Sequence, residues 1–249
     1  MCKLKSAIIL KDRIFIPDYD SHSDMLEELG IADDYLGASK KFVRAELSPA
    51  DGDVFSDIDG WTFTVDQDIL PEWFSEDVYK PKMVEAVKEW AKGRIHIGVD
   101  GLKIESGENH YIKDCKNVQI FGSASVRAYD SVSVRAYDSV SVEAHGSVSV
   151  EAYDSVSVRA YDSVSVEANG SARVWAHDSA RVRAHDSARV RAHDSAIIHN
   201  SKVSRWKNQD TLMLCENATF KDNIGRVIYQ SGDYKLVKVE SGKKIGEVE

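Results

Sequence analysis

An eight-residue unit repeats through the second half of this 249-residue chain and restricts its fold more than any other feature. Nine consecutive octads run from Ser123 to Asp194, and a tenth, SAIIHNSK, begins in register and then diverges. Positions 2, 4 and 6 of each octad are Val or Ala, whereas positions 1, 3, 5 and 7 are mostly polar. This alternation with period two indicates a strand with one buried face and excludes an amphipathic helix.

Each octad ends in Asp or Gly and the next begins with Ser. These residues are typical of turns, because Asp and Ser side chains can bond nearby backbone amides. An octad is therefore about one short strand and a corner. A single strand cannot bury its Val and Ala face alone, so successive octads are expected to stack into a β-solenoid. Weaker repeats upstream, in GLKIES, NHYIKD and NVQIFG, place the expected start near Leu102.

The number of octads in one coil is open between two and three. Gly146 and Gly170 are 24 residues apart, which favours three octads per coil. Val and Ala are too small to fill a three-sided interior, whereas two facing sheets about 10 Å apart suit them. A coil of two octads also stacks Arg127, Glu143 and Arg159 with alternating sign of charge. We therefore predict two octads per coil, with three as the alternative.

Composition divides the chain into three parts, and the predicted fold class is mainly β. Residues 1–101 hold 12 Lys and Arg against 21 Asp and Glu, which accounts for the whole formal net charge of −9. They are predicted to form a small acidic α+β domain. Residues 102–200 are the predicted solenoid. Residues 201–249 are predicted to form a C-terminal β cap, with a hairpin around residues 231–233, that protects the last coil from edge-to-edge association.

Five short patterns predict the elements of the acidic domain. AIILKDRIFI indicates two strands around a Lys-Asp-Arg turn, and KFVRAEL and WTFTV indicate two more. SDMLEELG predicts a helix with Ser23 as its N-cap and Gly30 as its stop. KPKMVEAVKEWAK predicts an amphipathic helix with Pro81 in its first turn.

The cysteines and the N-terminus bear on the compartment. Cys2, Cys115 and Cys215 have neither a zinc-binding spacing nor the pattern of a disulfide framework, so reduced cytosol is the simplest environment. The apolar run near the N-terminus, AIIL, is too short for a signal-peptide core or a membrane span. We expect a cytoplasmic protein that does not associate with a membrane.

The front domain and the octads together resemble a group of uncharacterised proteins from gut bacteria and their phages. DSHSDMLEELG and VDQDILPEWF are the most specific stretches of this resemblance, which covers nearly the whole chain. The group combines this kind of front domain with variable numbers of short repeats, and the rod is similar in architecture to known β-solenoids. The resemblance implies a phage or mobile-element context in a bacterial host cell and carries no activity or functional residue.

The densest group of candidate metal ligands lies in PDYDSHSD. Asp18, Asp20, His22 and Asp24 offer oxygen and imidazole donors at alternating positions, a set that can hold a divalent ion. Acids also favour the dipole of a following helix, and we prefer this interpretation. No nucleophile–base set or phosphate loop accompanies them, so we expect no cofactor and no catalytic residue.

A second acidic group, Asp51, Asp53, Asp57 and Asp59, lies in the loop between two predicted strands. Its spacing lacks the pattern of an EF-hand calcium loop. We interpret these residues as a solvated acidic surface.

The last octads form the one segment of the chain that is both basic and aromatic. Between Ser171 and Asn200 there are five arginines and three aspartates. Such a segment favours an anionic partner, unless its arginines pair with the corner aspartates and leave only a solvated face. The residues predicted to bind a partner are Arg173, Trp175, His177, Arg181, Arg183, His185, Arg189, Arg191 and His193.

These observations favour a non-enzymatic binding or scaffolding protein, with the solenoid as a rigid spacer and display surface. One alternative is an inhibitor of host defence whose acidic domain imitates nucleic acid, and another is a metal-dependent hydrolase that uses Asp18, Asp20 and His22. We expect a protein partner, or self-association through the solenoid or through the acidic and basic ends. Nucleic acid is not an expected partner, because the net charge is −9.

Overall fold

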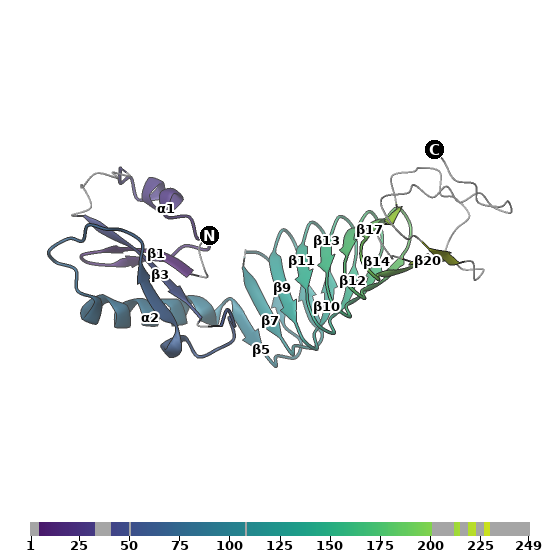
Figure 1. Ribbon diagram of the computed structural model, residues 1–249, viewed down its shortest axis with the longest axis horizontal. Helices are drawn as coiled ribbons and strands as arrows, with labels where there is room; N and C mark the ends of the chain where they lie inside the picture. The colour runs from purple at the N-terminus through teal and green to yellow at the C-terminus, as the bar shows by residue number, and fades with distance from the viewer. Residues whose placement is uncertain are drawn as a thin grey trace. The chain divides into compact units, whose positions relative to one another are not determined.

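The computed structural model describes residues 5–32, 41–49, 51–107 and 109–200, together with three short strands at 212–214, 219–222 and 227–229. The chain forms two compact units, Met1–Ile95 and His96–Glu249. The first is a small α+β unit and the second is a β-solenoid (Figure 1). No helix in the described ranges is both long enough and apolar enough to cross a membrane.

The first unit is built on a four-stranded antiparallel sheet. In spatial order its strands are β2 (Ile14–Phe15), β1 (Lys5–Leu10), β3 (Phe42–Ser48) and β4 (Thr62–Val65). The sequence predicted all four. The Lys-Asp-Arg turn closes the hairpin of β1 and β2, where the Leu10 N–H donates to the Arg13 carbonyl at 2.8 Å.

The helix α1 (His22–Glu28) packs on β1 and contributes to a cluster of buried side chains made of Ile8, Met25, Leu26 and Phe42. The prediction of Ser23 as its N-cap was wrong. Ser21 is the N-cap, and its hydroxyl accepts the Asp24 N–H at 3.3 Å. His22, Met25 and Leu26 share one helix face, and burial of this face on the sheet sets the start of the helix.

The helix α2 (Glu76–Lys92) begins one turn earlier than predicted. Glu76 and Asp77 occupy its first turn, where acids favour the positive end of the helix dipole. Pro81 consequently lies inside the helix, where it supplies no N–H to the preceding turn. A short 3₁₀ turn, η1 (Ile58–Gly60), contacts α2. The buried residues of α2 are Tyr79, Met83, Val84, Val87 and Ala91.

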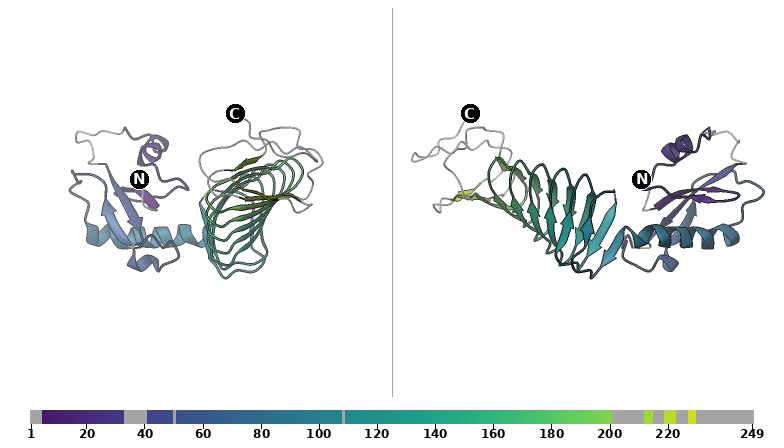
Figure 2. Two further views of the ribbon diagram at one scale, coloured as in Figure 1. Left: turned by 45° about the vertical axis from the view of Figure 1, so that its right-hand side comes forward. Right: turned by 180° about the vertical axis from the view of Figure 1, so that it is seen from behind.

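The solenoid strands alternate between two sheets (Figures 1 and 2). The eight-stranded sheet contains β5 (Ile95–Ile97), β7 (His110–Lys113), β9 (Ser125–Tyr129), β11 (Ser141–Ala144), β13 (Ser157–Ala160), β15 (Arg173–Ala176), β17 (Arg189–Ala192) and β19 (Leu212–Leu214). The nine-stranded sheet contains β6 (Lys103–Ile104), β8 (Val118–Ile120), β10 (Ser133–Ala136), β12 (Ser149–Ala152), β14 (Ser165–Ala168), β16 (Arg181–Ala184), β18 (Ile197–Asn200), β20 (Thr219–Asp222) and β21 (Val227–Tyr229).

Consecutive octads lie on opposite sheets, so each coil holds two octads, as predicted. Strands pair in parallel with the strand two octads away, and Val142, for example, lies beside Val158. This register excludes the alternative of three octads per coil for the described octads. Gly146 and Gly170 therefore belong to different corner rows, because Gly146 lies beside Asp130 and Gly170 lies beside Asp154.

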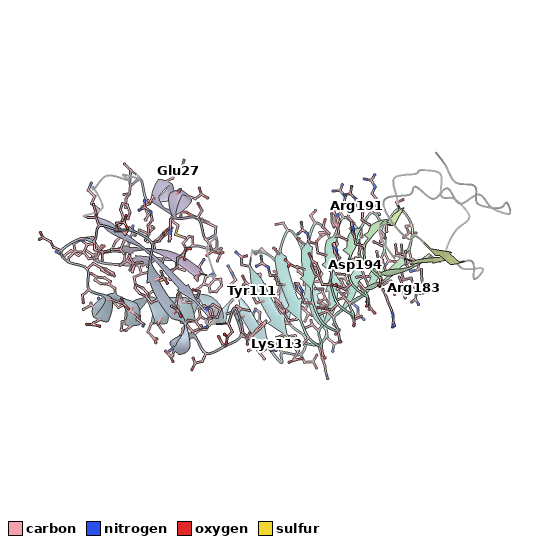
Figure 3. The ribbon with its side chains drawn as sticks, in the orientation of Figure 1. Glu27, Tyr111, Lys113, Arg183, Arg191 and Asp194 are labelled. Carbon is pink, nitrogen blue, oxygen red and sulfur yellow. The ribbon has the colours of Figure 1, made fainter. Side chains whose placement is uncertain are left out.

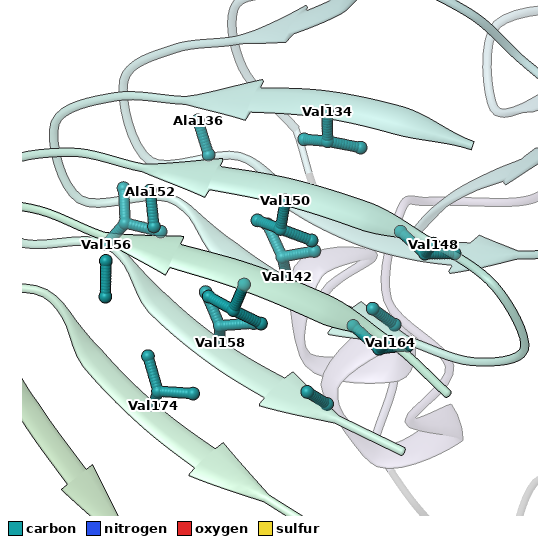
Figure 4. Close-up of a cluster of buried hydrophobic side chains, with 14 of the residues drawn as sticks. Val134, Ala136, Val142, Val148, Val150, Ala152, Val156, Val158, Val164 and Val174 are labelled. Carbon is teal, nitrogen blue, oxygen red and sulfur yellow. The ribbon is translucent and has the colours of Figure 1, made fainter. Parts of the chain in front are cut away.

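Side chains alternate between the inside and the outside of the coil. Arginine side chains at odd octad positions, such as Arg183 and Arg191, project outward (Figure 3). Val and Ala at even positions point inward, where those from Ala124 to Ala196 are at most 5% exposed (Figure 4). Burial of each Val side chain contributes roughly 1.5–3 kcal/mol relative to an exposed one. These inner rows form one continuous core along the solenoid.

The corners show why each octad ends in Asp or Gly. Every such residue has a positive φ, between 52° and 79°, which Asp tolerates better than most residues and Gly adopts freely. The aspartates also bond backbone amides, as their type indicated, but those of the adjacent coil. The Asp162 N–H donates to Asp178 Oδ2 at 3.1 Å, and the Asp178 N–H donates to Asp194 Oδ2 at 3.1 Å.

The solenoid extends beyond the octads in both directions. Its eight-stranded sheet begins with β5, ahead of Leu102. After the octads, β19 and β20 continue the two sheets in parallel, while β21 joins β20 in the antiparallel direction. As the last strand within the described residues, β21 is antiparallel and so breaks the pattern that a further coil would have to match. The hairpin predicted around residues 231–233 lies outside the described residues.

Three substitutions of Asp178 separate its two roles at the corner. Asp178→Ala loses the carboxylate acceptor and places a Cβ without polar compensation at φ 54°, so we expect a loss of about 2 kcal/mol in the free energy of unfolding. Asp178→Gly keeps the backbone conformation and loses only the acceptor, at about 1 kcal/mol. Asp178→Asn keeps both and should change stability by less than about 0.5 kcal/mol. Urea unfolding followed by circular dichroism measures all three, and equal losses would contradict the two-role account.

Candidate partner-binding face

The residues predicted to bind a partner are divided between two surfaces, because consecutive octads lie on opposite sheets. The eight-stranded sheet carries Arg173, Trp175, Arg189 and Arg191. The nine-stranded sheet carries Arg181 and Arg183. Figure 3 shows Arg191 and Arg183 on different sides of the coils.

The eight-stranded sheet presents the more basic of the two surfaces. Its outer side near the last octads is formed by Arg159, Arg173, Trp175, Arg189 and Arg191, which we name the arginine–tryptophan face. Trp175 lies between Arg159 and Arg191 on adjacent strands, with the Arg159 guanidinium carbon 5.8 Å from the centre of a Trp175 ring. Arg173 lies directly beside Arg189. The face therefore combines four cations with one half-buried aromatic ring.

Among the described residues the four arginines of this face are not neutralised by a direct contact, although Arg159 lies beside Glu143 on the adjacent strand. None of them forms an ion pair or a side-chain hydrogen bond there. The corner carboxylates of Asp178, Asp186 and Asp194 accept backbone N–H groups. Adjacent like charges on paired strands are unfavourable, so stability of the fold does not account for Arg173 beside Arg189.

The first half of the solenoid distributes its charges differently. There Arg127 Nε lies 3.3 Å from a Glu143 oxygen, and Arg135 Nε lies 2.9 Å from a Glu151 oxygen, each on an adjacent strand. The hydrogen bond from Arg135 holds the pKa of the Glu151 carboxyl below its usual value. Arginine and glutamate thus compensate each other in these coils, in contrast to the arginine–tryptophan face.

The nine-stranded sheet is only partly basic near its end. Arg183 lies beside Glu167 on the neighbouring strand, and His185 Nε2 lies 3.3 Å from a Glu167 oxygen. Arg181 lies beside Ser165. One carboxylate therefore offsets part of the positive charge on this surface.

A row of stacked rings borders the arginine–tryptophan face, and sequence reasoning expected ladders of His and Tyr without identifying which rings stack. Tyr129, His145, Tyr161, His177 and His193 stack in that order, with ring centroids 5.1, 4.8, 5.1 and 4.9 Å apart. These rings occupy position 7 of every second octad, and the 16-residue register places such positions side by side. Ring faces that cover each other are unavailable for stacking on a ligand, so His177 and His193 contribute ring edges and rigidity to this border.

The other side of the coil has a shorter row of rings. Phe121 stacks on Tyr137 and Tyr137 on Tyr153, in each case with centroids 5.1 Å apart. His185, the remaining predicted histidine, follows in this row after Asn169. The three histidines predicted to act together are therefore divided between the two sides.

The structure disperses the four candidate ligands of PDYDSHSD. Asp18 pairs with Arg94 at 2.5 Å, and Asp20 pairs with the buried Lys5 at 2.7 Å. Desolvation of Lys5 lowers the pKa of its amine, although Asp20 counteracts this effect. These two carboxylates neutralise cations of the first unit, and they do not form a ligand set with His22.

His22 and Asp24 also take separate roles. Asp24 lies in the first turn of α1, as expected for an acid that favours the helix dipole. His22 is buried, and its neighbours are Glu46 on β3 and Asp66 after β4. No sequence pattern indicates these neighbours, because they lie more than twenty residues away along the chain.

Most of the acidic-loop residues stabilise the loop itself. Asp53 and Asp57 each accept the N–H two residues further on, at 3.0 and 3.2 Å. Asp59 forms an ion pair with Lys88 of α2 at 2.7 Å. Asp51 is exposed. Three of the four carboxylates therefore have a local structural role.

Comparison with known proteins supplies no relative whose functional residues could be compared with this site. The chain matches no protein-family model, no curated protein sequence and no solved structure.

The Arg135–Glu151 hydrogen bond predicts a measurable pKa change. Arg135→Gln should raise the folded-state pKa of Glu151 toward its ordinary value, because the first cause of the lowering is removed. With a lowered folded-state pKa, Glu151 stabilises the native solenoid above its unfolded-state pKa, and this contribution is lost as pH falls through the folded-state pKa. Carboxyl NMR titration of both proteins measures the shift. An unchanged Glu151 pKa in the variant would contradict the assignment.

Proposed function

We propose that this protein is a non-enzymatic binding and scaffolding protein whose solenoid presents the arginine–tryptophan face to an acidic protein partner. The observation that carries the proposal is the set of four arginines arranged around Trp175, none of which forms an ion pair among the described residues. Arginine and tryptophan are the side chains that most often dominate protein–protein binding energy.

The scaffold supports recognition by holding these side chains at fixed spacing. Neighbouring strands of a sheet are about 4.8 Å apart, so the face offers cations at regular intervals along the solenoid. The closed Val and Ala core and the corner hydrogen bonds keep the backbone of each coil in one conformation. A preorganised face loses little conformational entropy when it binds.

An acidic protein surface suits this face better than a nucleic acid. The chain as a whole carries a net charge of −9, which opposes the approach of a long polyanion. A protein partner needs only a local acidic patch that meets the arginines. The acidic first hundred residues of a second copy provide one such patch, so self-association belongs to the same proposal. The resemblance noted above favours a phage or mobile-element setting in a bacterial cell.

Two double variants with equal change of charge test the proposal. Arg173→Glu with Arg189→Glu reverses the centre of the arginine–tryptophan face, whereas Arg181→Glu with Arg183→Glu makes the same change on the opposite sheet. Affinity capture from the native host at physiological salt, read by quantitative mass spectrometry, compares both with the unaltered chain. We expect the first variant to bind the recovered partner at least about ten-fold more weakly, because each reversed charge is worth up to about 1 kcal/mol.

The second double variant is the control and should retain the partner. Binding that falls equally in both variants would indicate a non-specific charge effect and contradict the proposal. Recovery of no partner by the unaltered chain, together with a monomer in light scattering at low and high salt, would also contradict it. A nucleic acid in place of a protein among the recovered molecules would overturn the choice of partner.

A further inference from the structure

Three side chains with metal-binding atoms converge in the first unit, from parts of the sequence that are far apart. His22 is the first residue of α1, Glu46 lies on β3, and Asp66 follows β4. Their candidate ligand atoms all lie within 4.8 Å of one another, the one such group among the described residues. The set contains one imidazole and two carboxylates.

The His22 ring is held in an orientation that suits metal binding. It is 8% exposed, and its Nε2 lies 3.2 Å from the Ala45 carbonyl oxygen. A carbonyl oxygen only accepts hydrogen bonds, so Nε2 carries a proton. In the neutral ring the lone pair is then on Nδ1, which lies 3.4 Å from Asp66 Oδ2. Metal-binding histidines commonly donate their other N–H to a backbone carbonyl in this way.

The backbone that carries the two carboxylates is fixed by strand pairing. Glu46 lies opposite Thr64 in the antiparallel ladder of β3 and β4. Directly after β4, the Asp66 N–H donates to the Arg44 carbonyl at 2.9 Å. Asp66 and Glu46 are therefore brought together by the same sheet that provides the carbonyl bound by His22.

Charge balance distinguishes this group from the other acids of the unit. Asp18 and Asp20 have Arg94 and Lys5 as partners. No lysine or arginine in the described ranges forms an ion pair with Glu46 or Asp66. Two carboxylates this close repel each other unless a cation lies between them.

We propose that His22, Glu46 and Asp66 bind a divalent transition-metal ion, and Zn²⁺ is the ion that we expect. The donors, one nitrogen and two oxygens, are those that zinc accepts, and bonds near 2.0 Å place ligand atoms of a tetrahedral site about 3.3 Å apart. His22 and Asp66 already have this separation. Asp66 is 63% exposed, so the carboxylate can adjust and water can complete the coordination. The site differs from the Asp18–Asp20–His22 set and is independent of the partner-binding face.

The test is titration of the full chain with Zn²⁺ and with Co²⁺ after removal of metals by a chelator. Isothermal titration calorimetry measures stoichiometry and affinity, and visible absorption of Co²⁺ reports nitrogen and oxygen ligation. We expect one ion per chain. Asp66→Asn and Glu46→Gln should each weaken binding at least about ten-fold, since loss of even an indirect ligand contact costs that much. Asp68→Asn, an exposed acid two residues further on, is the matched control and should bind as the unaltered chain does.

Each other outcome overturns the proposal. If His22 is simply protonated and paired with Asp66, neither metal will bind at one equivalent or raise the unfolding temperature. If the ion instead binds at the solenoid histidines, Asp66→Asn and Glu46→Gln will retain full affinity for the metal. The double variant His177→Ala with His193→Ala will then lose metal binding. Circular dichroism of Asp66→Asn confirms that the exposed substitution leaves the fold intact, so loss of binding cannot be attributed to unfolding.

Discussion

Parallel pairing between every second octad is the interaction on which the rest of the solenoid depends. It places each residue beside the residue at the same octad position one coil away, so that Val lies on Val and Ala on Ala. The inner rows gain from this arrangement because small apolar side chains pack closely and exclude water. The corner rows gain because carboxylates such as those of Asp178 and Asp194 accept an N–H from the adjacent coil. The inner rows and the corners thus supply stability in every coil, whatever residues occupy the outer rows.

On the outer rows the same stacking has unequal consequences. Rings at position 7 stack on rings, and Arg127 pairs with Glu143, so both arrangements stabilise the solenoid. Arg173 lies beside Arg189, and the repulsion between these like charges destabilises the solenoid. This unfavourable pair is the reason for proposing that the face binds a partner. The group proposed to bind a metal in the first unit rests on similar reasoning, because its two close carboxylates have no lysine or arginine partner among the described residues.

Prediction from the sequence succeeded for features that depend on residues close together along the chain. Alternation within one octad indicated the strand, and the interior volume of Val and Ala indicated two octads per coil. The N-cap of α1 is Ser21 and not the predicted Ser23, because burial of His22, Met25 and Leu26 on the sheet sets the start of that helix. The set of basic residues was predicted as one surface, yet β15 and β16 belong to different sheets.

The sequence by itself determined the repeating strand, the corner residues and the uneven distribution of charge, and it favoured two octads per coil over three. Only the tertiary structure decided which distant residues meet: Arg173 with Arg189, the ring row from Tyr129 to His193, and His22 with Glu46 and Asp66. The physical reason is that a strand's periodicity specifies which side of the strand is buried. The pairing of strands and the packing of α1 on its sheet specify the neighbours, and these depend on contacts across the whole fold.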